Sequence, residues 1–176
     1  RDVVLVVDDE AINQMVLTAV LDPDYRVLSA VSGLEALEMA RGSPRPDLIL
    51  LDVMMPGMDG FETCRALRSI PGCESLPVLM LTGLDDDASI QLAYEVGATD
   101  FFVKSQQWSL LVGRLRYLLR SARTRHELER SKSKLARAQD LARMGSFEWR
   151  RHDGLGFSVE ALRVFGLGPH QKLGFG

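Results

Sequence analysis

The chain has 176 residues, 46% of them hydrophobic, and its 21 basic and 24 acidic side chains give a formal net charge of −3. This is an ordinary globular composition, long enough for one full domain and something extra. No run of about 18 apolar residues and no signal-peptide pattern occurs, which argues against a membrane association and favours a soluble, cytoplasmic protein. Cys64 and Cys73 form neither a CxxC nor a metal-binding pattern.

The first part of the chain alternates between predicted strands and helices. Residues 2–7 are apolar and β-branched, which indicates a buried strand, and Asp8, Asp9 and Glu10 follow it without a break. Apolar residues then recur at helical spacing over 11–21.

A short second strand and a capped helix come next. The strand is predicted at 26–30. Ser32 and Glu35 form a capping box at the start of the helix, and Gly42 follows its end.

A third strand ends in a carboxylate. Residues 48–51 are large and apolar, which is typical of a strand buried on both faces, and Asp52 stands at its end. In an open α/β sheet the carboxyl ends of the strands form the crevice where ligands bind, so Asp52 is a candidate functional residue. Asp59 and Glu62 then cap a helix that extends to about Arg68.

Two further strands complete a sheet. Residues 77–82 form a strand that ends in Thr82, a helix is capped by the acids at 85–87, and a short strand at 100–103 ends in Lys104. Five strand and helix alternations predict an α/β fold: a doubly wound, five-stranded parallel sheet, flavodoxin-like with strand order 2-1-3-4-5.

A long helix follows over residues 108–144. Its middle, 120–134, is almost wholly polar, while Leu128, Leu135 and Ala142 lie a heptad apart. We therefore expect a parallel, dimeric coiled coil, the alternative being a solvated helix without a partner. Acidic residues are mixed with the basic ones and no aromatic residue is interleaved, so no nucleic acid partner is expected.

The last residues do not complete a domain. Residues 147–150 alternate as in a strand, after Gly145-Ser146 and before a turn at Asp153-Gly154. About thirty residues cannot bury a core alone, so we expect the front of a truncated second domain and a longer natural protein.

The predicted sheet brings five polar residues to one crevice. Asp8, Asp9, Asp52, Thr82 and Lys104 stand at the carboxyl ends of four strands. Crowded carboxylates repel one another, and a divalent cation holds them ionised; oxygen ligands without His or Cys favour Mg²⁺. With a lysine and a hydroxyl added, this is a phosphoryl-transfer site that has a carboxylate nucleophile.

These residues resemble the receiver domains of bacterial two-component response regulators. The resemblance covers roughly residues 2–121 and rests on the acidic pair, on Asp52 within Leu-Asp-Val-Met-Met-Pro-Gly-Met-Asp-Gly, on Thr82-Gly83 and on Lys104. It implies that Asp52 accepts a phosphoryl group from a phosphohistidine of a sensor histidine kinase or phosphotransfer protein. It also implies that Asp9, Asp52 and the backbone carbonyl of Met54 bind Mg²⁺, while Asp8 helps to orient bound water.

The resemblance also implies a switch, with two departures from the family pattern. Thr82 would move toward the acyl phosphate and Phe101 would turn inward; the less favoured alternative for Phe101 is a simple core residue. Ser105 stands where family members commonly have Pro, often with a cis bond, after the lysine; a non-Pro cis bond is costly, so the sequence leaves open whether this peptide is cis. The bulky Met54 is expected to shield the acyl phosphate from water and to slow its hydrolysis.

A weaker resemblance extends beyond the receiver. Residues 135–149 resemble the lead-in helix and first strand of a PAS sensor domain. The expected organisation is therefore a receiver at 1–121, a helical coiled-coil linker at 122–144, and the first part of a PAS-like domain at 145–176. The output that follows would be cyclic di-GMP turnover or, alternatively, a hybrid histidine kinase.

Three other interpretations use the same sheet. A Mg²⁺-dependent phosphohydrolase with an Asp nucleophile would want a second Asp two residues later, where Met54 stands. A flavodoxin-like electron carrier would want a phosphate cradle after the first strand, where Asp8 and Asp9 repel phosphate. A degenerate receiver that serves only for binding is disfavoured because the key positions carry the expected residue types.

Overall fold

The computed structural model describes residues 1–83, 87–104, 108–141, 147–150 and 154–157. The chain divides into two compact units, Arg1–Arg123 and Thr124–Gly176. Within the described residues, no helix is both long and apolar enough to cross a membrane.

The first unit is built on a five-stranded sheet of order β2-β1-β3-β4-β5, with every neighbouring pair parallel. The strands are β1 (Val3–Val7), β2 (Arg26–Ala30), β3 (Leu48–Asp52), β4 (Val78–Thr82) and β5 (Asp100–Val103). Every residue of β1, β3 and β4 is buried, whereas β2 at the edge is partly exposed. The predicted flavodoxin-like sheet is therefore confirmed.

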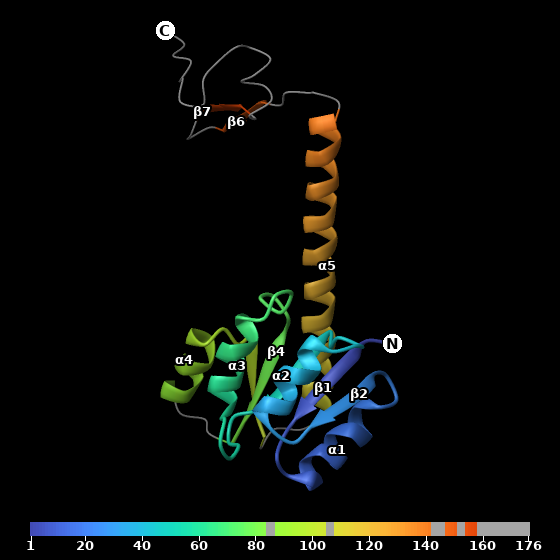
Figure 1. The fold of residues 1–176 in the computed structure, drawn as a ribbon, viewed down its shortest axis with the longest axis vertical. Coiled ribbons are helices and arrows are strands. Elements are labelled where there is room, and N and C mark those ends of the chain that lie inside the picture. Colours follow the sequence, from blue (N-terminus) through green and yellow to red (C-terminus); the bar gives the residue numbers. More distant parts are fainter. Residues whose placement is uncertain (84–86, 105–107, 142–146, 151–153, 158–176) are drawn as a thin grey trace. The chain divides into compact units, whose positions relative to one another are not determined.

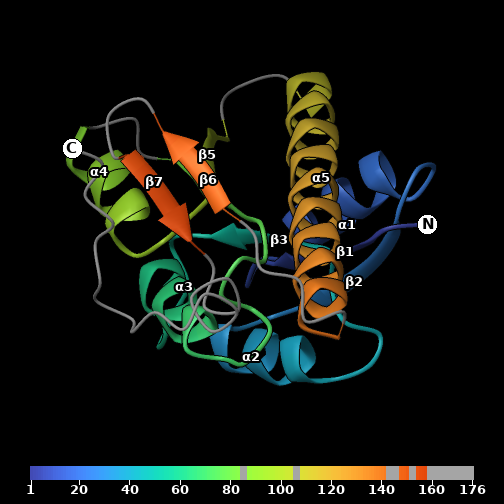
Figure 2. The ribbon, with the colours of Figure 1, turned by 90° about the horizontal axis from the view of Figure 1, so that it is seen from above.

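Helices cover both faces of this sheet (Figures 1 and 2). They are α1 (Ala11–Leu21), α2 (Gly33–Arg41), α3 (Gly60–Arg68), α4 (Asp87–Glu95) and α5 (Trp108–Leu141). Because successive strand residues point to opposite faces, Val4 and Val6 pack with α1 and α5, while Leu5 and Val7 pack with α2, α3 and α4. The sheet therefore separates two apolar cores, one on each of its faces.

Among the helix starts that the structure describes, one differs from prediction; the predicted cap of α4 at 85–86 lies outside the described residues. At α3 the capping box is complete, since Asp59 accepts from the N–H of Glu62 at 2.7 Å and Glu62 accepts from that of Asp59 at 3.2 Å. At α2, Ser32 accepts from Glu35, but the Glu35 carboxylate accepts from the N–H of Val31 at 2.8 Å. The φ of Ser32 is −156° against −72° for Asp59, so the backbone differs between the two N-cap residues.

The long helix α5 begins at Trp108 as predicted and is described as far as Leu141; the predicted end at Met144 lies outside the described residues. Three of its arginines form ion pairs with acids of the first unit: Arg114 with Asp100, Arg116 with Asp24 and Arg123 with Asp2. In the second unit, β6 (Phe147–Arg150) and β7 (Gly154–Phe157) form an antiparallel pair, which confirms the predicted strand at 147–150.

Gly60 allows α3 to start against the end of β3. A Cβ atom there would lie 2.8 Å from the Cα of Val53 and closer still to the carbonyl oxygen of Asp52. Both neighbours are backbone atoms, so the end of the strand would have to shift. Gly113, an exposed residue within α5, differs in that a Cβ atom added to it would meet no atom within 4 Å.

We predict opposite effects for alanine at these two glycines. Gly60→Ala should lower the free energy of unfolding by about 1–3 kcal/mol through overpacking. Gly113→Ala should raise it by roughly 0.5–1 kcal/mol, because alanine restricts the unfolded chain and favours the helix. Urea unfolding followed by circular dichroism measures both, and equal stability of Gly60→Ala and the wild type would contradict the close approach.

Candidate functional site

Four strand ends place the predicted site residues at one edge of the sheet. Asp8 directly follows β1, Asp52 ends β3, Thr82 ends β4, and Lys104 directly follows β5. Backbone bonds fix the last of these ends, since the N–H of Lys104 donates to the carbonyl of Thr82 at 2.8 Å. The structure therefore brings together side chains that lie up to 96 residues apart in the sequence.

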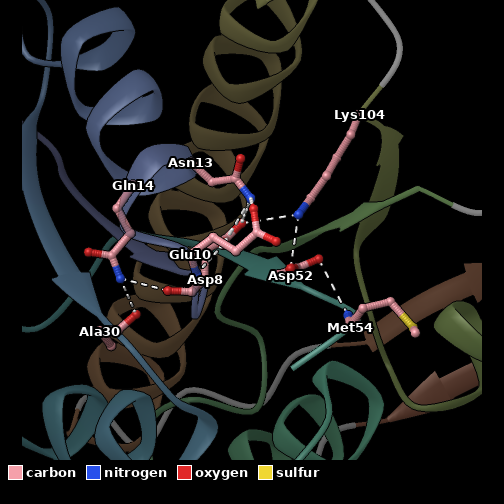
Figure 3. Close-up of polar contacts among 8 residues, drawn as sticks. All are labelled: Asp8, Glu10, Asn13, Gln14, Ala30, Asp52, Met54 and Lys104. Carbon is pink, nitrogen blue, oxygen red and sulfur yellow. Dashed lines mark hydrogen bonds and ion pairs between the residues drawn. The ribbon is translucent and has the colours of Figure 1, made fainter. Parts of the chain in front are cut away.

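Asp8 is fully buried and accepts hydrogen bonds on both carboxylate oxygens (Figure 3). Its Oδ1 accepts from the backbone N–H of Glu10 at 2.9 Å, and its Oδ2 contacts Nζ of Lys104 at 3.1 Å. The side-chain amide of Asn13 donates to both oxygens, each at 3.1 Å. Together these donors compensate the loss of hydration of a buried charge.

Asp52 is 3% exposed and also contacts Lys104, with Nζ and Oδ2 2.9 Å apart. Burial raises the pKa of the Asp52 carboxyl above its ordinary value, and the negative charge of Asp8 adds to the rise. The ion pair with Lys104 and the N–H of Met54, 3.4 Å from Oδ1, act in the opposite direction. Lys104 is thus the main group that favours the ionised form of Asp52, with a smaller contribution from the Met54 N–H.

Lys104 bridges the two buried carboxylates (Figure 3). Its side chain is 26% exposed, and partial burial acts to lower its pKa. The hydrogen bonds and charges of Asp52 and Asp8 outweigh that effect, so the pKa of Lys104 is raised and the ammonium group stays protonated.

A third carboxylate completes the cluster. One oxygen each of Asp8, Asp9 and Asp52 lie within 4.8 Å of one another, and Asp9 is exposed. Three carboxylate oxygens with an exposed side are a donor set that fits Mg²⁺, which keeps several of its waters. The backbone N–H of Met54 lies beside Asp52; the ligand role of the Met54 carbonyl stays a prediction.

Phe101 lies at the margin of a core rather than within it. It is partly buried, packs against the core under α2, α3 and α4, and meets Tyr94 of α4 edge-to-face at a ring-centroid distance of 6.0 Å. Arg114 of α5 donates to its carbonyl oxygen at 2.9 Å. Thr82 is buried at 3% exposure. The switch roles of both residues stay predictions, and the peptide after Lys104 lies outside the described residues.

Sequence reasoning missed the amides of α1 and the aromatic partner of Phe101. Asn13 contacts Asp8, and Gln14 donates to the backbone carbonyls of Asp8 at 2.6 Å and of Ala30 at 3.0 Å. The available signal was two adjacent amide residues in the first turn of a helix that begins just after the acidic pair. Which side chain reaches the carboxylate depends on the direction of that helix, which the periodicity alone does not give.

A family model describing the response regulator receiver domain matches residues 4–116. The chain belongs to the response regulator receiver family.

Curated relatives share this part of the chain and, in two cases, more of it. The transcriptional regulatory protein AfsQ1 of Streptomyces coelicolor is 41% identical over 116 residues, 66% of this chain and 50% of AfsQ1. The response regulator PleD of Caulobacter vibrioides is 40% identical over 157 residues, 89% of this chain and 34% of PleD. A probable cyclic di-GMP phosphodiesterase of Vibrio cholerae is 33% identical over 159 residues, 90% of this chain and 35% of that protein. The chain therefore spans half or less of the length of these relatives.

Solved structures agree with the fold of the first unit. The chemotaxis protein CheY4 of Vibrio cholerae superposes with a TM-score of 0.63 at 35% sequence identity, covering 66% of this chain and 98% of CheY4. About a third of this chain has no counterpart in that structure.

We predict that Asp52→Asn stabilises the metal-free protein in a pH-dependent way. A carboxyl with a raised folded pKa contributes stability below its ordinary value of 3.8, and that contribution is lost as pH rises through the folded value. The variant should therefore melt at a higher temperature than the wild type at pH 7 in EDTA, with a difference that shrinks toward pH 4. Thermal melts at the two pH values test this prediction.

The matched control is Asp9→Asn, which removes the exposed carboxylate of the same cluster. Because that carboxylate stays hydrated, its removal should raise the melting temperature less at pH 7. A lower melting temperature for Asp52→Asn than for the wild type at pH 7 would contradict the prediction.

Proposed function

We propose that the chain is the phosphoacceptor receiver module of a two-component signalling protein, with Asp52 as the nucleophile. The donor is a phosphohistidine on a sensor histidine kinase or a phosphotransfer protein. One observation carries the proposal: a buried carboxylate, Asp52, contacts a protonated lysine 2.9 Å away and shares a cluster with two further carboxylates. Such a site neutralises a phosphoryl group while offering an oxygen nucleophile.

In this reaction an oxygen of Asp52 attacks the phosphorus atom in line with the donor imidazole. A bond from phosphorus to the carboxylate oxygen forms, and the bond to the histidine nitrogen breaks with its electron pair remaining on the imidazole. Lys104 neutralises charge on the phosphoryl oxygens. Asp9, Asp52 and the Met54 carbonyl would hold Mg²⁺, which supplies further charge neutralisation, while Asp8 orients a bound water.

Thr82 and Phe101 would change position in response to the acyl phosphate on Asp52. The acyl phosphate presents new acceptor oxygens, toward which the Thr82 hydroxyl moves, and Phe101 turns into the space that Thr82 leaves. Two contacts support this role. The Phe101 ring contacts the exposed Tyr94 edge-to-face at the margin of the core. Arg114 of α5 donates a hydrogen bond to the carbonyl oxygen of Phe101.

The helix α5 would carry that change to an output in the longer protein. The proposed organisation is a receiver at 1–121, a linker at 122–144 and the start of a PAS-like domain at 145–176, of which the hairpin β6–β7 is the described part. Matches to PleD and to the probable phosphodiesterase extend to 157 and 159 residues, whereas the match to AfsQ1 covers 116. The long match to the probable cyclic di-GMP phosphodiesterase supports cyclic di-GMP turnover as the output, the alternative being a hybrid histidine kinase.

We predict that Mg²⁺ and acetyl phosphate label the wild type on Asp52 and that Asp52→Asn abolishes the label. Phosphoryl incorporation by intact-protein mass spectrometry, beside molar mass by light scattering, measures both the chemistry and its readout. An absence of label on the wild type, together with an absence of Mg²⁺ binding, would overturn the proposed function.

Met54 is 65% exposed beside the site, and a label half-life of only seconds would contradict its shielding role.

A separate prediction concerns the linker as a dimer contact. Leu128 and Leu135 are 53% and 61% exposed, which places a seven-residue apolar repeat on the mostly polar part of α5. In a parallel coiled coil these leucines face a second copy of the chain. Replacing both by Asp should shift the dissociation constant of self-association at least tenfold upward, as measured by analytical ultracentrifugation.

The control is Ser133→Asp, which adds a charge at an exposed position that faces outward whether Leu128 is an a or a d residue. It should leave self-association unchanged. A wild type that stays monomeric at high micromolar concentration, with and without the phosphoryl group, would contradict the dimer.

A further inference from the structure

Asn13 is the side chain through which α1 reaches the acidic cluster. It lies in the first turn of α1, and its Nδ2 donates to Oδ1 and Oδ2 of Asp8 and to Oε2 of Glu10, each at 3.1 Å (Figure 3). The amide thus has three carboxylate acceptors from two different residues. A neutral donor placed between two carboxylates orients both without adding a charge of its own.

The backbone of Asp8 is held by other contacts. Gln14 donates to the Asp8 carbonyl at 2.6 Å, and the N–H of Asp8 donates to the carbonyl of Ala30 at 3.2 Å. With its backbone fixed in this way, the freedom left to Asp8 is rotation of its carboxylate. That rotation is what Asn13 restrains, because it is bonded to both oxygens.

The other donors to Asp8 do not replace this restraint. The N–H of Glu10 reaches Oδ1 alone, and Nζ of Lys104 reaches Oδ2 alone while also serving Asp52. Lys104 stands on a long flexible side chain and is the group that a phosphoryl group would engage. Among the described contacts, Asn13 is therefore the one that defines the carboxylate plane independently of Lys104.

We propose that Asn13 is a positioning residue that holds the carboxylate of Asp8 in the orientation required by a divalent cation in the Asp8, Asp9 and Asp52 cluster. The inference rests on the proposed function and deepens it. Without the amide, the carboxylates of Asp8 and Glu10 repel each other directly and Asp8 turns toward Lys104. Loss of an outer contact of this kind typically weakens metal binding by about 10–100-fold.

The test is the Mg²⁺ affinity of the unphosphorylated chain, measured by isothermal titration with MgCl₂ at constant ionic strength. Asn13→Ala should bind Mg²⁺ at least tenfold more weakly than the wild type. Ile12→Ala truncates the neighbouring side chain on the same turn, which is 76% exposed, and should bind as the wild type does. In acetyl phosphate reactions, Asn13→Ala should need more Mg²⁺ for half-maximal labelling but approach the wild-type rate at saturation.

A second variant separates orientation from volume and charge. Asn13→Asp keeps the size of the side chain, has no N–H to donate at pH 7, and adds a negative charge that by itself would attract Mg²⁺. Positioning predicts weaker binding in this variant as well, even if Asn13→Ala proves poorly folded in EDTA melts. Wild-type affinity in Asn13→Ala, or tighter binding in Asn13→Asp, would overturn the inference; absent binding in the wild type would instead overturn the proposed function.

Discussion

The site depends on one lysine that holds two buried carboxylates together. Asp8 and Asp52 are almost fully removed from water, and ionised carboxylates are costly in such surroundings unless they are paired. Lys104 contacts both carboxylates at hydrogen-bond distance. It follows the edge strand β5, whereas Asp8 follows β1, and β3 and β4 lie between these two strands in the sheet. The central strands β1, β3 and β4 must therefore keep their register for these charges to meet.

The fold follows from the sequence because its central strands β1, β3 and β4 are buried on both faces. The run that ends in Asp52 and the run that ends in Thr82 are bounded by loop residues, so their buried faces and their ends could be predicted together. The helix at Ala11–Leu21 was likewise predictable from its spacing and from the Pro that follows it. Once the strand ends are known, the meeting of Asp8, Asp52, Thr82 and Lys104 follows from parallel topology.

Contacts made through side-chain direction were beyond that reasoning. The bonds of Asn13 to Asp8 and of Arg114 to the carbonyl of Phe101 depend on how a helix is rotated about its axis. The carboxylate of Glu35 accepts from Val31 rather than from Ser32, a shift of one residue that the spacing of Ser32 and Glu35 does not predict. The leucines of the polar part of α5, Leu128 and Leu135, are both exposed, and their packing against a second helix stays a prediction.

Three arginines of α5 form ion pairs with acids at the amino-terminal ends of the strands. Asp2 directly precedes β1, Asp24 comes shortly before β2, and Asp100 opens β5, whereas the acidic cluster lies where the strands end. From Arg114 to Arg123 the helix rises about 13 Å along this attachment. The attachment of α5 and the acidic cluster therefore lie at opposite ends of the same strands and draw on different residues.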